Sequence, residues 1–223
     1  MKDNTGAGCA ADGKELDRIV NAPIFFERNR VYRNYIGGEG FRALMNDGTG
    51  DNSFPEEWIA SKGKAINPVY FGERDGVSVA EGCGIYLDDL IAVRPDEMLG
   101  GTKYDCLVKY LDSAIRLPVQ VHPTPEFSLK HFGSPYGKTE AWLVLAKRSE
   151  DACLYFGFKD KIDLDTLKAY ADRSLDERDI LTELINPVKV DVGDVYLINA
   201  GLIHAIGAAP CSKCRNRRIS RYR

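Results

Sequence analysis

The segment Glu140-Ala-Trp-Leu-Val-Leu-Ala-Lys147 decides the class of fold that the sequence predicts. It is short, apolar and opened by a single carboxylate, which is typical of a core β-strand whose first residue meets the interior of a sheet or barrel. Similar short runs, bounded by Gly, Pro or charged turns, lie before and after it. They are Glu56–Ser61, Asn67–Gly72, Gly76–Ala80, Asp105–Asp112, Arg116–His122, Cys153–Phe158, Val188–Val192 and Val195–Asn199.

Many short strands joined by turn residues predict a mainly β chain, arranged as an antiparallel sandwich or small barrel. Helical patterns are fewer. Leu87–Leu99 has helix-like apolar spacing, interrupted by Pro95. Thr124–Phe132 predicts a helical turn, because Pro125 suits the first position of a helix.

A helical insertion is expected at about residues 163–185, as two amphipathic helices, Asp163–Arg173 and Ser174–Ile185. Ser174 and Glu177 have the spacing of a capping box, which predicts the start of the second helix. The chain then divides into three parts. Residues 1–20 are expected to form a loose leader, residues 21–207 one domain that contains the insertion, and residues 208–223 a basic tail.

Composition narrows the functional classes. The 223 residues are 44% hydrophobic and 28% charged, and the net charge of −3 gives no general attraction to nucleic acid. No apolar run reaches the roughly 20 residues of a membrane span, and the first residues lack the apolar core of a secretory signal. A cytoplasmic protein is therefore expected, and in that reducing compartment Cys9, Cys83, Cys106 and Cys153 are predicted to be free buried thiols.

Four potential metal ligands stand at the ends of the predicted strands. Gln120 and His122 are two residues apart on one strand, so both side chains face the same side. Glu140 opens the central strand, and His204 follows a hairpin predicted for Gly193–Gly201. Two imidazoles, a carboxylate and an amide oxygen suit zinc and leave positions open for water or substrate, as a catalytic site requires.

Each of these residues has an ordinary interpretation when it is taken alone. A histidine is more often packed or solvated than bound to a metal, and His131 is read that way. Gln120 alone is a polar strand residue, and Glu140 alone is a surface charge at a strand end. Gly137-Lys138-Thr139 is not a nucleotide-binding loop, because it lacks the upstream glycine and precedes a strand.

The ordered set of motifs resembles the type I mannose-6-phosphate isomerases of the cupin superfamily. The family patterns Q-x-H-P, K-x-E and A-G-x-x-H-A correspond to QVHP at 120–123, KTE at 138–140 and AGLIHA at 200–205. EEWIAS at 56–61 and KYDCLVKYLDS at 103–113 also resemble segments of that family. The resemblance spans about residues 25 to 207, and the motifs are specific when taken together.

The resemblance implies a cupin-type β-sandwich or barrel with a helical insertion. It implies an enzyme that interconverts mannose 6-phosphate and fructose 6-phosphate through an enediol, with a sugar phosphate as partner and neither nucleic acid nor membrane. One zinc ion would be held by Gln120, His122, Glu140 and His204. Lys109 and Lys138 match lysines of the family's active site and are the expected catalytic residues, while Trp58 and Ser61 are expected to bind substrate. The sequence predicts no oligomeric state and no general base.

Two departures from the family pattern keep other functions open. Pro118 stands where relatives carry a serine, and Asn199 stands where a proline is usual. A cupin that binds a sugar or sugar phosphate without turnover is the alternative. An iron oxygenase of the same fold is disfavoured by the glutamine ligand and by the lysines.

The tail, AAPCSKCRNRRISRYR at 208–223, does not continue the β pattern, and five of its last nine residues are Arg. The Cys211–Cys214 spacing suits a zinc ribbon, but no second pair completes one. A basic nucleic-acid tail is a second interpretation. The third, which we favour, is a frameshift, because a neighbouring frame can encode a segment that resembles the family's Q-E-P-T-D strand. Loss of the strands and active-site arginine expected there would leave sheet edges unpaired and impair catalysis.

Overall fold

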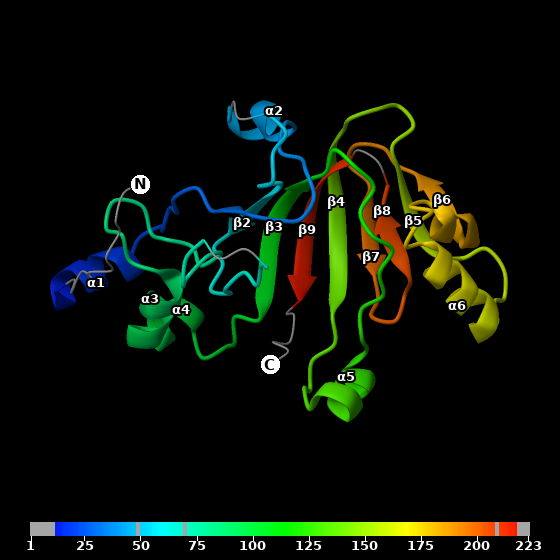
Figure 1. Ribbon diagram of the computed structural model, residues 1–223. Helices are drawn as coiled ribbons and strands as arrows, with labels where there is room; N and C mark the ends of the chain where they lie inside the picture. The colour runs from blue at the N-terminus through cyan, green and yellow to red at the C-terminus, as the bar shows by residue number, and fades with distance from the viewer. Residues whose placement is uncertain (1–11, 48–49, 69–70, 208–209, 218–223) are drawn as a thin grey trace.

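The computed structural model describes residues 12–47, 50–68 and 71–207, and the backbone of 210–217. Its strands form two antiparallel sheets (Figure 1). The six-stranded sheet has the order β1-β2-β3-β9-β4-β7, and the three-stranded sheet has the order β6-β5-β8. The strands are β1 Arg30–Val31, β2 Glu56–Ile59, β3 Cys106–Asp112, β4 Thr139–Lys147, β5 Cys153–Phe158, β6 Ile185–Lys189, β7 Val195–Ile198, β8 His204–Ile206 and β9 Pro210–Arg217.

The helices lie around the sheets, at both ends of the arrangement and above and below it (Figure 1). They are α1 Gly13–Val20, α2 Phe41–Met45, α3 Leu87–Val93, α4 Pro95–Leu99, α5 Pro125–Phe132, α6 Leu164–Arg173 and a 3₁₀ helix at Ile180–Leu184. The chain is thus an α/β protein with antiparallel sheets. The antiparallel sheets of the prediction are confirmed. The described strands form two open sheets and no closed barrel, and the helices between them make the chain α/β where a mainly β chain was predicted.

Local chemistry sets the helix boundaries that were predicted. Thr124 caps α5, because its hydroxyl accepts a hydrogen bond from the Phe127 amide at 3.2 Å. Asp163 caps α6 in the same way through the Thr166 amide. Pro95 divides the helical run after Leu87 and occupies the first turn of α4.

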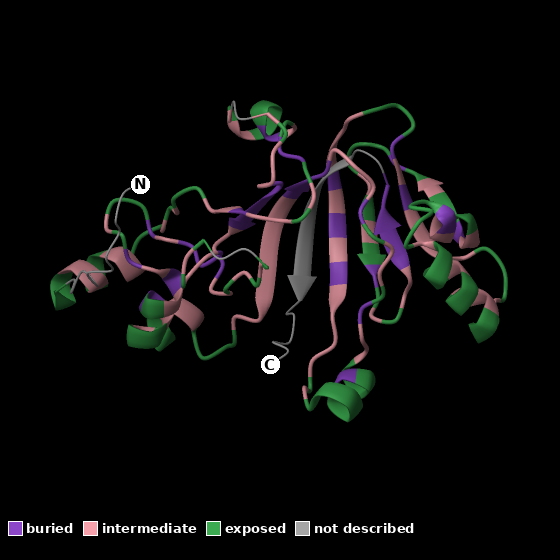
Figure 2. Ribbon diagram, in the orientation of Figure 1, coloured by how far each residue is buried: buried purple, intermediate pink, exposed green. Residues whose placement is uncertain are grey.

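The core lies between the inner faces of the two sheets. Along β4 the side chains alternate, so that Glu140, Trp142 and Val144 are buried while their neighbours are partly exposed (Figure 2). Trp142 and Val144 pack with Leu154 of β5 and Ile206 of β8, which joins the two sheets. Full burial of each such aliphatic side chain contributes roughly 1.5–3 kcal/mol, so this contact holds the sheets together.

The tail forms a strand that the sequence pattern did not predict. β9 lies between β3 and β4 and pairs with both, over Cys106–Asp112 on one side and Thr139–Lys147 on the other. Strands β3 and β4 therefore have no open edge towards each other, and the strands at the edges of the two sheets are β1, β7, β6 and β8. The pairing of β9 depends on β3 and β4 rather than on its own sequence. The facing edges of these two strands carry backbone donors and acceptors that can pair with almost any extended segment between them. The backbone of Cys211–Cys214 lies in this ladder, and residues 208–209 and 218–223 lie outside the described residues.

Several predicted strands differ from the structure. Arg116–His122 forms only an isolated bridge at Gln120, and Gly76–Ala80 only bridges at its end. Within Asn67–Gly72 the described positions belong to no strand. The predicted hairpin over Gly193–Gly201 was also wrong, since β7 pairs with β4 whereas β8 pairs with β5. Pro118 interrupts the Arg116–His122 segment and Pro123 follows it, and proline cannot donate a hydrogen bond to a β-ladder.

The predicted second helix of the insertion, Ser174–Ile185, is mostly a turn and a short 3₁₀ helix. Ser174 ends α6 and its hydroxyl donates to the Ala171 carbonyl, so it caps no new helix. Glu177 instead pairs with Arg173 at 2.8 Å. Its side chain is thus engaged with the preceding helix.

The N-terminal leader was expected to lack structure, but its described part contains α1. Asp12 caps this helix, and Leu16 and Ile19 pack against a small core around Leu90. Residues 1–11 lie outside the described residues. The thiols of Cys83 and Cys153 are half-buried, where full burial was predicted, and Cys9 is not described. In the part of the chain that the structure describes, no helix is both long and apolar enough to cross a membrane.

Candidate metal centre

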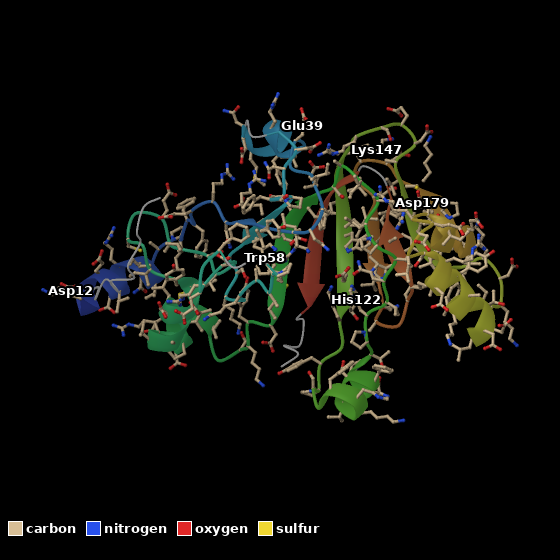
Figure 3. All side chains as sticks on the ribbon, viewed as in Figure 1. Asp12, Glu39, Trp58, His122, Lys147 and Asp179 are labelled. Atoms are coloured by element: carbon tan, nitrogen blue, oxygen red, sulfur yellow. The ribbon has the colours of Figure 1, made fainter. Side chains whose placement is uncertain are left out.

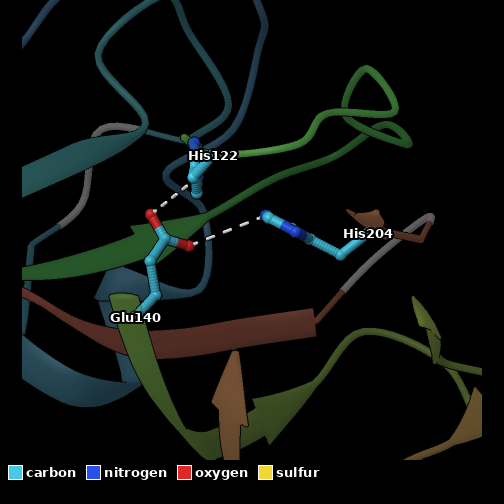
Figure 4. A group of neighbouring side chains, drawn as sticks. All are labelled: His122, Glu140 and His204. Atoms are coloured by element: carbon cyan, nitrogen blue, oxygen red, sulfur yellow. Dashed lines mark ion pairs between the residues drawn. The ribbon is translucent and has the colours of Figure 1, made fainter. Parts of the chain in front are cut away.

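Three segments that are distant in the sequence bring His122, Glu140 and His204 together (Figure 4). His122 lies between the bridge at Gln120 and the start of α5, Glu140 is the second residue of β4, and His204 opens β8. The backbones of Gln120 and His204 exchange two hydrogen bonds of 2.9 Å. The site therefore lies where the two sheets meet, and the exchange keeps the Gln120 segment beside β8.

The geometry of the three side chains suits one cation. A ligand atom from each lies within 4.8 Å of the others. Nε2 of His122 is 3.2 Å from Oε1 of Glu140, and Nε2 of His204 is 3.9 Å from Oε2. All three side chains are buried. Two imidazole nitrogens and a carboxylate form a donor set that binds divalent metals such as zinc.

The orientation of His204 makes it ready to bind a metal. Its Nδ1 lies 2.8 Å from the Leu202 carbonyl, to which an N–H at that position donates. The lone pair is then on Nε2, which is buried and has no hydrogen-bond partner among the described residues. Burial lowers the pKa of His204, and this favours the neutral form that binds metals. A buried acceptor without a partner is costly, and a cation bound by Nε2 would remove that cost.

Glu140 is held as a carboxylate. Burial alone would raise its pKa, but the hydrogen bond with His122 and the charge of Lys138 outweigh burial and hold the pKa well below its usual range. Trp142 donates its indole N–H to Oε2 at 3.0 Å, and Nζ of Lys138 lies 2.7 Å from Oε1. The same Nζ is 2.9 Å from Nε2 of His122. Lys138 therefore contacts both His122 and Glu140.

Gln120 lies beside the centre through its backbone bridge to His204, whereas Trp58, Ser61 and Lys109 lie across β9 from it. Trp58 is in β2 and pairs with Lys109 of β3, and in Figure 3 Trp58 appears on the β2 side while His122 lies beside β4. Ser61 is buried just after β2, and its hydroxyl is bonded to the backbone of Gly63. The metal ligands and Lys138 are thus one cluster, and Trp58 and Lys109 belong to a second.

The register of the sheet relates the two clusters. Lys109 of β3 and Trp142 of β4 both pair with position 214 of β9. Paired positions project to the same side of a sheet, and side chains two residues apart share a face. Trp58, Lys109, Trp142 and Glu140 therefore share one face of the six-stranded sheet. The backbones of Lys109 and Trp142 are two strand spacings apart, roughly 9–10 Å.

Sequence reasoning missed the residue at the centre of the second cluster. Glu56 is buried, and its carboxylate accepts hydrogen bonds from Tyr35, Trp58 and Lys109 and pairs with Arg33. The available signal was its place two residues before Trp58, because alternation then puts both on one face. A buried carboxylate there needs cations nearby, and the sequence offers Arg33 and Lys109.

Two cavities open beside the metal centre. One of about 880 Å³ is lined by Glu140 together with Lys103, Asp105 and Tyr136. The other, of about 330 Å³, lies beside His122. The larger cavity is big enough for a small-molecule ligand, and Glu140 is one of the residues that line it. His131 is outside the centre. Its ring stacks on that of Phe127 in α5, with 4.3 Å between the ring centroids.

Known proteins that are similar to this chain carry the family name that the motifs indicated. Over 192 residues the chain is 29% identical to a curated protein of Streptococcus mutans named mannose-6-phosphate isomerase, an alignment that covers 83% of this chain and 54% of the relative. The chain is similar to mannose-6-phosphate isomerases. The resemblance seen in the motifs is thus confirmed, and the chain spans about half the length of the curated relative. No protein-family model matches the chain.

Solved structures of mannose-6-phosphate isomerases share the fold. The enzyme from Bacillus subtilis superposes with a TM-score of 0.67 at 22% identity, covering 89% of this chain and 59% of that one. A mannose 6-phosphate isomerase bound with zinc and yttrium gives a TM-score of 0.56 at 15% identity, covering 87% and 68%. The arrangement of the two sheets is therefore that of mannose-6-phosphate isomerase structures.

Proposed function

We propose that this chain is the metal-binding part of an aldose–ketose isomerase that interconverts mannose 6-phosphate and fructose 6-phosphate. The observation that carries the proposal is the buried group of His122, Glu140 and His204 in a chain similar to mannose-6-phosphate isomerases. The metal would be zinc, with the amide oxygen of Gln120 as the fourth ligand. The bridge between Gln120 and His204 supports this, because it keeps the Gln120 segment beside the centre.

The proposed unit is a cupin-type domain built on residues 21–207, with the helical insertion at about 163–185. Helix α1 from the expected leader and strand β9 from the tail at 208–223 pack onto it. Superposition on mannose-6-phosphate isomerase structures supports the cupin-type fold. The proposed setting is the cytoplasm, where the substrate would be a free sugar phosphate. Neither nucleic acid nor membrane is a proposed partner, and the net charge of −3 agrees with this.

The chemistry requires a proton to move between C1 and C2 of the open-chain sugar through an enediol. Bound zinc would stabilise the negative charge that develops on the sugar oxygens. Lys138, next to Glu140, supplies a further positive charge at the same oxygens. Lys109 supplies a cation farther along the sheet face, and Trp58 and Ser61 are proposed to shape the substrate end of the site.

The test is metal analysis combined with an assay of fructose 6-phosphate formation. The purified chain should contain one zinc ion and should form fructose 6-phosphate from mannose 6-phosphate. His204→Ala should lose most of its zinc, because a buried ligand is removed. His131→Ala is the matched control and should keep the metal, since His131 lies on α5 outside the centre.

Other results assign other functions. Zinc with sugar-phosphate binding but no turnover would favour the binding protein without catalysis. Iron with oxygen uptake would favour an oxygenase. Metal content at the wild-type level in His204→Ala would rule out the centre itself.

A further inference from the structure

We propose that Glu56 is a positioning residue that holds the ammonium group of Lys109 towards an anionic oxygen of the sugar phosphate. The proposal rests on the proposed function for the identity of that ligand. Nζ of Lys109 lies 2.7 Å from Oε1 of Glu56, and the two side chains are 13% and 3% exposed. Each is therefore largely shielded from water, so the pair is held in one geometry with little screening.

The carboxylate of Glu56 is itself fixed on both sides. The Tyr35 hydroxyl donates to Oε1 at 2.8 Å, and the Trp58 indole donates to Oε2 at 2.7 Å. Nε of Arg33 lies 3.1 Å from Oε2. A carboxylate with partners on both oxygens has little freedom to rotate. It can therefore act as a rigid support for Lys109.

The support leaves Lys109 able to bind a ligand. An ammonium group has three N–H donors, and Glu56 takes one of them. Among the described residues, no other hydrogen bond of this ammonium is found. Lys109 also faces the same side of the sheet as Glu140, across β9. An anion bound at the metal centre and extending over this face would meet the two remaining donors.

Charge explains why a carboxylate is needed at position 56. Arg33 and Lys109 would otherwise be two like charges near one buried position. Burial raises the pKa of Glu56, but the charges of Lys109 and Arg33 more than offset this and lower the pKa to about 2. Glu56 is thus negative at neutral pH. Both Arg33 and Lys109 are paired with it.

The experiment measures binding of fructose 6-phosphate to zinc-loaded protein by calorimetry. The variants are Glu56→Gln, Lys109→Met and the two combined. The matched control is Glu57→Gln, because Glu57 is also buried but faces the other side of β2 and pairs with Arg30. Each single variant should weaken binding about tenfold or more, the usual effect of losing a charge-assisted hydrogen bond. The double variant should bind no more weakly than Lys109→Met, and Glu57→Gln should bind as the wild type does.

A second readout separates positioning from stability. The ¹H–¹⁵N signal of the Lys109 ammonium should be sharp in the wild type and in Glu57→Gln, and broadened in Glu56→Gln. If Lys109→Met weakens the binding of inorganic phosphate by the same factor as it weakens the binding of fructose 6-phosphate, the phosphate group lies at Lys109. A fall in kcat with unchanged KM would place a sugar oxygen there.

Wild-type binding by Glu56→Gln, or losses that multiply in the double variant, would overturn the proposal. So would a wild-type protein that binds no fructose 6-phosphate. If the protein binds the sugar phosphate as described but does not turn it over, the isomerase function fails and the role of Glu56 stands. Should Glu56→Gln not fold, the Lys109→Met and double variants decide the outcome, because the double variant removes both members of the pair.

Discussion

At the scale of single residues, charge is concentrated on two buried carboxylates that share a sheet face. Glu140 belongs to the metal centre and Glu56 to the lysine cluster. In both cases burial disfavours the charge, and nearby cations more than compensate. Breaking such a pair commonly costs several kcal/mol, because the remaining group is left buried and charged.

The lowered pKa of Glu56 predicts how stability depends on pH. Its folded-state pKa of about 2 lies below the ordinary value of 4.5, so its contribution is fully present above pH 4.5. That contribution is lost as the pH falls towards 2, and it amounts to roughly 3 kcal/mol. Glu56→Gln should therefore be less stable than the wild type at pH 7 and should lose less stability between pH 5 and 2. Urea unfolding at a series of pH values measures both.

Glu57→Gln is the control, because the pKa of Glu57 is shifted in the opposite direction from that of Glu56. Burial raises the pKa of Glu57, so its contribution is present at low pH and is lost as the pH rises. The Glu57→Gln variant should therefore lose as much stability between pH 5 and 2 as the wild type does. If Glu56→Gln loses as much stability between pH 5 and 2 as the wild type does, the Glu56 carboxylate is not paired as described.

At the scale of elements, β9 connects the two halves of the large sheet. A chain that ends at Gly207 lacks this strand and leaves β3 and β4 with open edges, whereas a chain that ends at Arg217 keeps it. The shorter chain should unfold at least about 10 °C lower, at roughly 2–4 °C per kcal/mol, and should associate through the exposed edges. Thermal unfolding and light scattering compare the two chains. Equal melting temperature and size would mean that β9 contributes nothing to the sheet.

The strands also show which parts of the fold a sequence pattern can predict. β4 and β5 were predicted within a residue, because their apolar runs are long and bounded by charges. β9 was missed, since Pro210–Arg217 has no alternation and its pairing comes from its neighbours. The motifs singled out His122, Glu140 and His204, which the structure brings together, whereas Glu56 required the register between β2 and β3. Local pattern predicts strands, and only tertiary contacts reveal which charges are buried together.

At the scale of the whole molecule, the metal centre joins the two sheets. Glu140 lies in the six-stranded sheet and His204 in the three-stranded sheet. A metal bound by both would stabilise only the folded state, by about 4 kcal/mol at a free concentration a thousand times the Kd. Removing zinc with a chelator should therefore lower the melting temperature by about 8–16 °C. Calorimetry with and without chelator measures this, and His204→Ala should show almost no difference. An equal chelator effect in that variant would place the metal elsewhere.

The position of β9 has a further consequence for how the protein is made. Strand β3 ends at Asp112 and β4 ends at Lys147, so both are synthesised well before the segment that separates them in the sheet, which begins at Pro210. During translation they have no backbone partner at their facing edges, and pairing them directly would be a misfolded state. Completion of the sheet must await the arrival of residues 210–217, and contacts so distant along the chain form slowly. The nascent polypeptide is thus exposed to self-association between the synthesis of β4 and that of β9, and chaperone binding during that interval would protect it.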